Sequence, residues 1–231
     1  MWLFLLMWPI LYGMFAIHSE MPAESVAIAK RLEETLDAQK FPTNEQWAIA
    51  PAYYFDADWQ GKNVDPLRAT SVQLLWTPRT LFIRFTARYR NITVFRDSDP
   101  GGRRYELWDR DVAEVFLQPH SSDVWRYKEF EVSPNGFWLD LDISSGKNEN
   151  LRSGMLRHVS IDEKNKVWVA DLALPMKSLT PHFDSKISWH VNFFRVEGPA
   201  EPRFYSSWRA TNSPKPNFHV PEAFGTLRFE E

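Results

Sequence analysis

Apolar and polar residues alternate with a period of two along most of the chain from Trp47 onward. This is the spacing of a β-strand that buries one face, because successive side chains of a strand point to opposite sides of the sheet. The clearest example is a pair of apolar runs at 72–76 and 81–85, joined by the polar segment Thr-Pro-Arg-Thr. Two such runs with a short polar connection predict a β-hairpin.

Further runs of this kind follow at short intervals. Turn-forming residues such as Pro134, Asn135 and Gly136 separate them, and no long helical pattern interrupts them. The runs are 112–118, 127–133, 137–142, 155–161, 166–174, 187–196 and 203–208. Many short strands without intervening helices predict an all-β chain, folded as one antiparallel β-sandwich of the jelly-roll or immunoglobulin-like type.

The N-terminal segment has a different pattern, because residues 1–17 carry no charged side chain. Such a stretch is short for a membrane span, which takes about 20 residues, and it fits a secretory signal peptide. We therefore expect a signal peptide at 1–19 and a secreted or periplasmic protein with no membrane span in its mature form. An uncleaved N-terminal membrane anchor is the alternative.

A segment rich in Ala, Glu and Lys connects this stretch to the predicted strands. Its apolar residues Val26, Ala29 and Leu32 recur at helical spacing. Residues 20–44 are therefore predicted to be a helical or flexible lead-in, and 45–231 to be the sandwich.

Charge and cysteine content exclude several classes of function. The chain has Lys+Arg 27 against Asp+Glu 30 and a formal net charge of -3, with no cluster of Lys and Arg. Because phosphate binding needs a concentrated basic surface, a nucleic-acid partner is not expected. The absence of Cys excludes a disulfide scaffold, a thiolate zinc site and a Cys nucleophile.

The chain is rich in tryptophan, with 11 Trp among its 231 residues. Those inside predicted strands, such as Trp76, Trp168 and Trp189, are expected to fill the core, because aromatic side chains dominate core burial. Trp108 is different, since it lies in the polar segment 103–111 just before a strand. An indole outside a strand is more often partly exposed, and an exposed indole can stack on the apolar face of a sugar ring.

Residues 107–117, with the sequence LWDRDVAEVFL, resemble the signature of family 9 carbohydrate-binding modules, in which Trp, Asp and Glu follow one another at three-residue intervals before Val/Ile and Phe. Other blocks agree with that family in the same order. They are 70–76 with 81–85, 127–136, 189–195 and 217–227. The resemblance spans 47–229, nearly the whole of the predicted mature chain.

The resemblance implies a stand-alone β-sandwich that binds saccharides, without catalysis, in polysaccharide catabolism. Such modules are often attached to plant-polysaccharide hydrolases such as xylanases, so a glycoside hydrolase is an expected partner. In the family two Trp side chains clamp a terminal sugar, and these positions fall here on Trp108 and Phe218. The family's polar carboxylate falls on Glu114, whereas its basic partner falls on Glu131, so this chain has an acid where an Arg would orient the ligand through paired hydrogen bonds.

A sugar site needs an aromatic surface and a few polar groups that fix orientation. We expect Trp108 and Phe218 to supply the first. The second is expected from Glu114, Asn192, Arg195 and His219. Other roles stay open for these side chains: a buried hydrogen-bonded pair that supports a loop for Asn192 and Arg195, a salt bridge from Glu114 to Arg195, and a turn position for His219.

Four aspartates flank the pair Gly101-Gly102 and offer the hard oxygen ligands that calcium prefers. They are Asp97, Asp99, Asp109 and Asp111. Calcium is also frequent in the family that the chain resembles, so a structural calcium ion is a candidate cofactor. Arg residues among these acids could neutralise them instead.

Three other functions are compatible with the sequence. Glycoside hydrolysis would use two of the acids Asp111, Glu114, Glu129 and Glu131 as paired carboxylates. Hydrolysis by a Ser-His-Asp triad is not indicated, because the sequence has no Gly-x-Ser-x-Gly elbow. Haem binding would recruit Met and His from Met155, His158, Met176 and His182. A structural sandwich that has lost its sugar site is the third.

Overall fold

The computed structural model describes residues 25–33, 41–119 and 122–231, and the statements below concern these residues. Within them, 13 strands form one curled sheet whose path runs β8-β7-β6-β5-β11-β13-β1-β3-β4-β10-β9, with β12 beside β11 and β2 beside β3. The strands are β1 (Val26–Arg31), β2 (Tyr53–Phe55), β3 (Thr70–Thr77), β4 (Thr80–Arg88), β5 (Val112–Gln118), β6 (Arg126–Val132), β7 (Trp138–Ser144), β8 (Lys147–Asn150), β9 (Leu156–Asp162), β10 (Val167–Pro175), β11 (Trp189–Glu197), β12 (Phe204–Ser207) and β13 (Gly225–Glu230). The helical turns are α1 (Asn44–Trp47), η1 (Pro66–Arg68), η2 (Leu107–Asp109), α2 (Met176–Leu179) and η3 (Pro221–Ala223).

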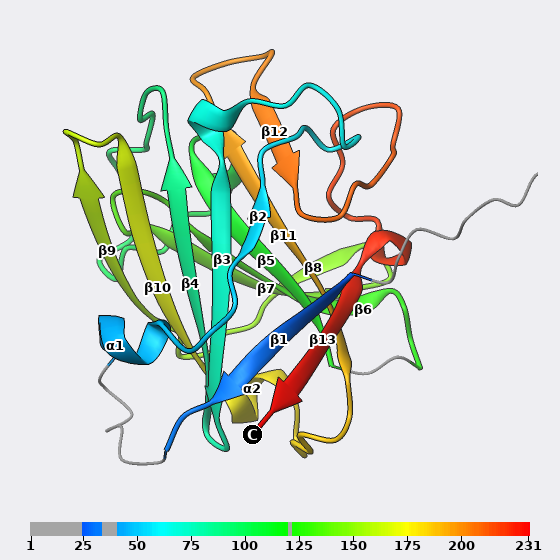
Figure 1. The fold of residues 1–231 in the computed structure, drawn as a ribbon. Helices are drawn as coiled ribbons and strands as arrows, with labels where there is room; N and C mark the ends of the chain where they lie inside the picture. The colour runs from blue at the N-terminus through cyan, green and yellow to red at the C-terminus, as the bar shows by residue number, and fades with distance from the viewer. Residues whose placement is uncertain (1–24, 34–40, 120–121) are drawn as a thin grey trace, which may run out of the picture.

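The sheet curls so that its two halves pack face to face (Figure 1). Phe85 and Trp168 on β4 and β10 enclose the main core together with Val115 and Phe193 on β5 and β11, and all four are fully buried. The Phe85 and Phe193 rings meet edge to face, 6.3 Å apart. This layout is consistent with a β-sandwich and confirms the nearly all-β prediction, while helix is confined to short turns.

Strand β1 corrects two expectations. The segment Val26–Arg31 is a strand and not a helix, and it pairs in parallel with both β13 and β3, so the sheet is mixed and not purely antiparallel. Val26 and Ala29 have the spacing of a helix, but the segment also alternates with the two-residue period of a strand. Ala27 and Ala29 lie on one face of this strand and are both fully buried. Residues 26–31 therefore belong to the folded unit, which begins before residue 45; the predicted signal peptide at 1–19 lies outside the described residues.

A second apolar cluster covers the outer face of β5, β6, β7 and β11. Phe116, Tyr127 and Phe194 project from these strands, and Phe218 and Phe224 from the loop before β13 cover them. The Phe194 and Phe218 rings stack with 4.3 Å between their centroids. This cluster fixes the loop against the sheet and leaves a depression beside it, where the candidate site lies.

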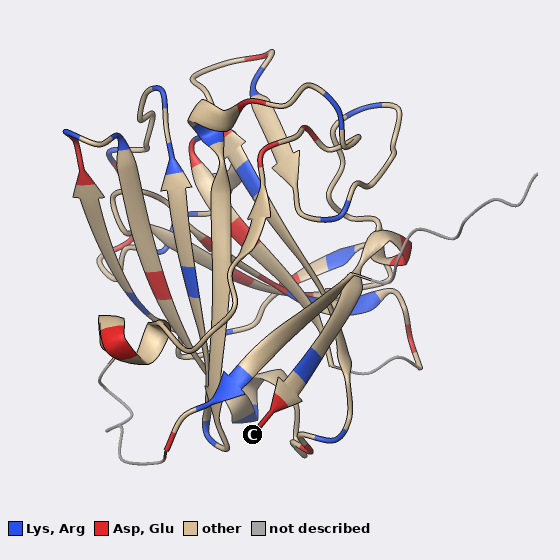
Figure 2. Cartoon of the chain, viewed as in Figure 1, with Lys and Arg blue, Asp and Glu red and all other residues tan. Residues whose placement is uncertain are grey.

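Charged residues of both signs are distributed over the described part of the chain. Lys and Arg are spread over many strands and loops and are interspersed with Asp and Glu (Figure 2). Among the described residues, no helix is both long and apolar enough to cross a lipid bilayer.

Candidate functional site

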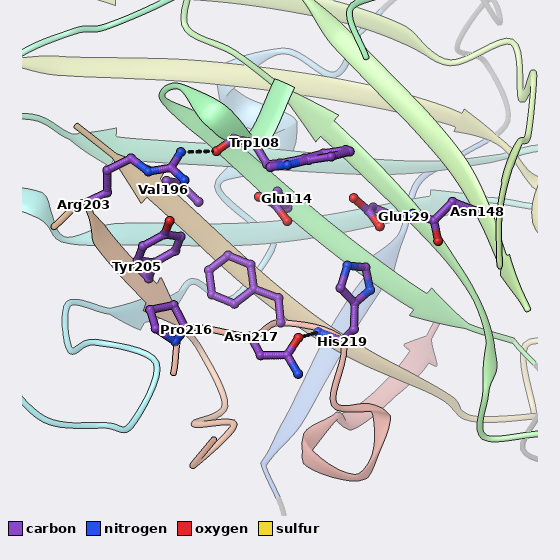
Figure 3. A pocket seen from close by; sticks show the side chains of 11 residues that line it. Trp108, Glu114, Glu129, Asn148, Val196, Arg203, Tyr205, Pro216, Asn217 and His219 are labelled. Carbon is purple, nitrogen blue, oxygen red and sulfur yellow. Dashed lines mark hydrogen bonds between the residues drawn. The ribbon is translucent and has the colours of Figure 1, made fainter. Parts of the chain in front are cut away.

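A pocket of about 240 Å³ opens on the outer face of β5 and β6. The indole of Trp108 lies on one side of it, and Asn217 and His219 lie on the other, with the carboxyl groups of Glu114 and Glu129 between them (Figure 3). The pocket therefore combines an aromatic wall with polar groups on the strands beneath it.

Trp108 reaches the pocket from the short turn η2, which the fully buried Leu107 anchors to the second apolar cluster. Arg203 holds the turn in place, because its Nη1 donates a hydrogen bond of 2.5 Å to the Trp108 carbonyl oxygen. The edge of the Tyr105 ring packs against the indole at 5.4 Å. Trp108 is half-buried, as the sequence predicted for an indole outside a strand, and so offers aromatic surface to a ligand.

Phe218 lines the pocket but does not form the open second wall that the resemblance implied. It is only 8% exposed, because one face of its ring is stacked on Phe194. Tyr205 on β12, which is half-buried and lies 6.0 Å from Phe218, supplies a further aromatic side chain of the pocket. The sequence pattern gave no reason to select Tyr205 from its predicted strand, since its proximity to Trp108 depends on how distant loops fold together.

His219 lies in the pocket, as predicted. Its ring packs on Phe116 at 5.2 Å, and its Nδ1 is 2.8 Å from the hydroxyl oxygen of Tyr127. These two contacts fix the imidazole on the side of the pocket opposite Trp108.

Three glutamates lie side by side beneath the pocket, and we refer to Glu114, Glu129 and Glu131 as the carboxyl cluster. Glu114 on β5 is the direct cross-strand partner of Glu131 on β6, and Glu129 is one pleat away on the same face. The three residues are 2%, 3% and 0% exposed. Glu114 and Glu129 line the pocket, and Glu131 lies behind them with neither of its carboxyl oxygens hydrogen-bonded to a described residue.

Burial raises the pKa of all three carboxyl groups, because it disfavours their charged forms. The pKa values of Glu114 and Glu131 lie well above the ordinary value, since neighbouring carboxylates add to the effect of burial. For Glu129 the adjacent carboxyl group of Glu131 and the charge of His219 oppose the effect of burial on the pKa.

Asn192 and Arg195 do not line the pocket, so their assignment to the sugar site is corrected. The Asn192 side chain braces the chain after β12, donating to the Arg209 carbonyl oxygen at 3.0 Å and accepting from the Arg209 amide at 2.9 Å. Arg195 is fully buried above the Trp168 ring and binds Glu197 at 3.2 Å, not Glu114. Both are buried and make hydrogen bonds within the protein, as the alternative prediction held, but with separate partners and not as a pair.

The four aspartates proposed as calcium ligands are not brought together. Asp111 is fully buried and accepts hydrogen bonds from the amides of Thr93 and Gly198 at 3.0 and 2.8 Å. Asp99 accepts from backbone amides of its own turn, while Asp97 and Asp109 lie 3.8 Å from Arg104 and Arg203. Over the described ranges, no group of three or more His, Asp or Glu side chains could hold a metal ion.

The residues considered for haem binding also have ordinary structural positions. Met155 and Met176 are 3% and 2% exposed and belong to the main core. His158 packs against Phe41 on the outer face of β9, with 6.1 Å between the ring centroids.

Comparison with known proteins identifies the fold. No family model matches the sequence. An extracellular protein of Arthroderma benhamiae is 24% identical over 180 residues, which cover 71% of this chain and 80% of that protein. The crystal structure of a Bacteroides uniformis protein assigned a carbohydrate-binding role matches 90% of this chain and 100% of its own with a TM-score of 0.70 and 17% identity.

Two further solved structures are family 9 carbohydrate-binding modules from Caldicellulosiruptor kristjanssonii. The complex with cellotriose has a TM-score of 0.63 and 11% identity and covers 89% of this chain and 94% of its own. The complex with glucose has a TM-score of 0.59 and 10% identity and covers 89% and 96%. The chain therefore has the fold of family 9 carbohydrate-binding modules, as its sequence blocks predicted.

Proposed function

We propose that this protein binds a saccharide non-covalently in the pocket, with a sugar ring stacked on Trp108. The observation that carries the proposal is a half-buried indole facing hydrogen-bonding groups across a pocket of sugar size. Sugars present apolar C–H faces and a rim of hydroxyls, so they match a site of this composition. Glu114, Asn217 and His219 are the groups placed to orient the ring.

The similar proteins support this proposal and its setting. Two of the solved structures with this fold hold cellotriose and glucose, and the relative in Arthroderma benhamiae is described as extracellular. We propose in addition that the protein acts outside the cell, in polysaccharide catabolism, with a glycoside hydrolase as partner. The non-catalytic role is part of the proposal.

The test is a calorimetric titration with a panel of neutral, acidic and amino mono- and oligosaccharides. At least one should bind, and Trp108→Ala should weaken that binding by about 30-fold, since a central aromatic contact is worth about 2 kcal/mol. Trp125→Ala is the matched control, because Trp125 is 47% exposed and does not line the pocket. No response to any sugar would refute the proposal, and equal effects of the two substitutions would refute the site.

Glycoside hydrolysis is the second candidate, and the carboxyl cluster is the observation that favours it. Glu114 and Glu129 are diagonal cross-strand neighbours, a relation that places Cα atoms about 7–8 Å apart and is compatible with the about 5–9.5 Å between the carboxyl groups of glycosidases. The raised pKa of Glu114 suits a general acid. Release of reducing ends from polysaccharides, abolished by Glu114→Gln, would establish this activity.

A further inference from the structure

We propose that the sugar unit bound in the pocket carries a protonated primary amine, and that Glu114 and Glu129 receive this ammonium group with Glu131 behind them. The ligand class is thus an unacetylated amino sugar, as a monosaccharide or as the end of a polymer. The inference rests on the proposed saccharide-binding function and specifies its ligand.

The first argument concerns hydrogen-bonding capacity. Glu114 is 2% exposed, and its Oε1 has no hydrogen-bond partner among the described residues although it lies against the pocket. An ionised carboxylate only accepts hydrogen bonds, and an ammonium group only donates, with three N–H groups. One amine can therefore satisfy the acceptors that Glu114 and Glu129 direct into the pocket, whereas a hydroxyl offers a single donor.

The second argument concerns charge. Among the described residues, no Lys or Arg forms an ion pair with any member of the carboxyl cluster. Arg203, at the rim of the pocket, is held by Glu201 at 3.0 Å and lies 3.8 Å from Asp109, and Arg103, behind the cluster, lies 3.7 Å from Asp140.

His219 is the other titratable side chain of opposite sign that faces the cluster. Tyr127 and Tyr205 are neutral, and Asn148 on β8 has no charge. The described surroundings of the pocket thus contain three carboxyl groups and few free cations, so a cation supplied by the ligand would stabilise and balance their ionised forms. A metal ion is not the suitable cation, since the described residues contain no group of three or more acidic or His side chains able to hold one.

The experiment compares D-glucosamine and chitosan oligosaccharides with glucose, cello-oligosaccharides and N-acetylglucosamine on the full chain. At about pH 6 the amine is protonated, and a charge-assisted hydrogen bond should make the amino sugars bind about tenfold more tightly than their neutral counterparts. Glu129→Gln should lower the affinity for glucosamine more than that for glucose. Glu163→Gln, which changes an exposed carboxylate in the turn after β9, should leave both affinities unchanged.

A second readout measures protons. An ammonium group that settles against the carboxyl cluster lowers the pKa of its members, so binding of glucosamine should release protons in calorimetry repeated in buffers of different ionisation enthalpy. Glucose should release none. Neutral sugars that bind as tightly as amino sugars would overturn this inference and leave the proposed function standing, whereas failure of every sugar to bind would overturn both.

Discussion

Glu114 and Glu131 lie directly opposite each other on adjacent antiparallel strands, and both side chains are buried. Like charges in this relationship destabilise a sheet, and burial increases the cost of each charge. Burial and the neighbouring carboxyl groups raise the pKa of both side chains, which favours their neutral forms. The arrangement lowers the stability of the fold, and a destabilising pair of this kind beneath a pocket is a feature by which functional sites are recognised.

The first prediction concerns this pair. Glu131→Gln should increase the free energy of unfolding at neutral pH by about 1 kcal/mol or more, since one unit of pKa shift corresponds to about 1.4 kcal/mol. The amide keeps the shape of the side chain but cannot acquire a negative charge. Urea denaturation of both proteins at a series of pH values measures the effect.

The pH dependence of stability has a defined sign. The folded state holds protons on these carboxyl groups that the unfolded state has lost, so their contribution is complete below the unfolded pKa of about 4.3 and declines as pH rises through the raised folded values. The parent protein should therefore lose stability from mildly acidic to alkaline pH more steeply than Glu131→Gln. Equal slopes, or a slope changed as much by Glu163→Gln, would contradict the proposed ionisation behaviour.

A second prediction concerns Arg203, which positions Trp108 by a hydrogen bond to its carbonyl oxygen. Arg203→Gln should weaken saccharide binding by about tenfold, because a hydrogen bond from a charged group is worth about 1.5–3 kcal/mol and its loss frees the turn that carries the indole. Arg79→Gln is the control, since Arg79 is exposed at the hairpin between β3 and β4. Near-ultraviolet circular dichroism and titration with the best sugar test both variants, and an unchanged affinity would mean that the turn holds Trp108 without Arg203.

The strands were predictable because each carries its own signal. The run 112–118 coincides with β5, and several other runs fall within a few residues of their strands. Strand β1 was not predictable, since its Ala residues form helices readily in isolation and become a strand only between β13 and β3. The intrinsic secondary-structure preference of a short segment is weak, so pairing with neighbouring strands can override it.

The site was predictable only in part. Trp108, Glu114 and His219 were selected from the sequence and do meet at the pocket, whereas Asn192 and Arg195 were selected for polarity alone and lie elsewhere. No pattern within a strand shows which polar side chain will be satisfied internally. That depends on distant chain segments, such as the one containing Arg209, which supplies two of the three hydrogen bonds of Asn192.

A third prediction concerns calcium. Melting temperatures measured with calcium and with EDTA should agree, because the four aspartates near Gly101-Gly102 bind backbone amides or lie beside Arg residues instead of converging. A bound ion stabilises a protein by mass action, so a metal at this position would separate the two melting curves. Sugar affinity measured in both conditions gives an independent check.

The last prediction separates the two asparagines associated with the site. Asn192 is fully buried and makes three hydrogen bonds, to the amides of Phe193 and Arg209 and to the Arg209 carbonyl oxygen. Asn217 is exposed and lines the pocket. Asn192→Ala should therefore lower the free energy of unfolding by about 1–3 kcal/mol, because it leaves buried backbone groups unsatisfied, with little effect on sugar affinity.

Asn217→Ala should do the reverse, weakening sugar binding severalfold while changing stability by less than about 0.5 kcal/mol, the usual range for a surface substitution. Denaturation curves and calorimetric titrations of the two variants provide the four values required. A loss of affinity in Asn192→Ala comparable to that in Asn217→Ala would show that the hydrogen bonds between Asn192 and Arg209 also determine the shape of the pocket. The site would then extend to β11.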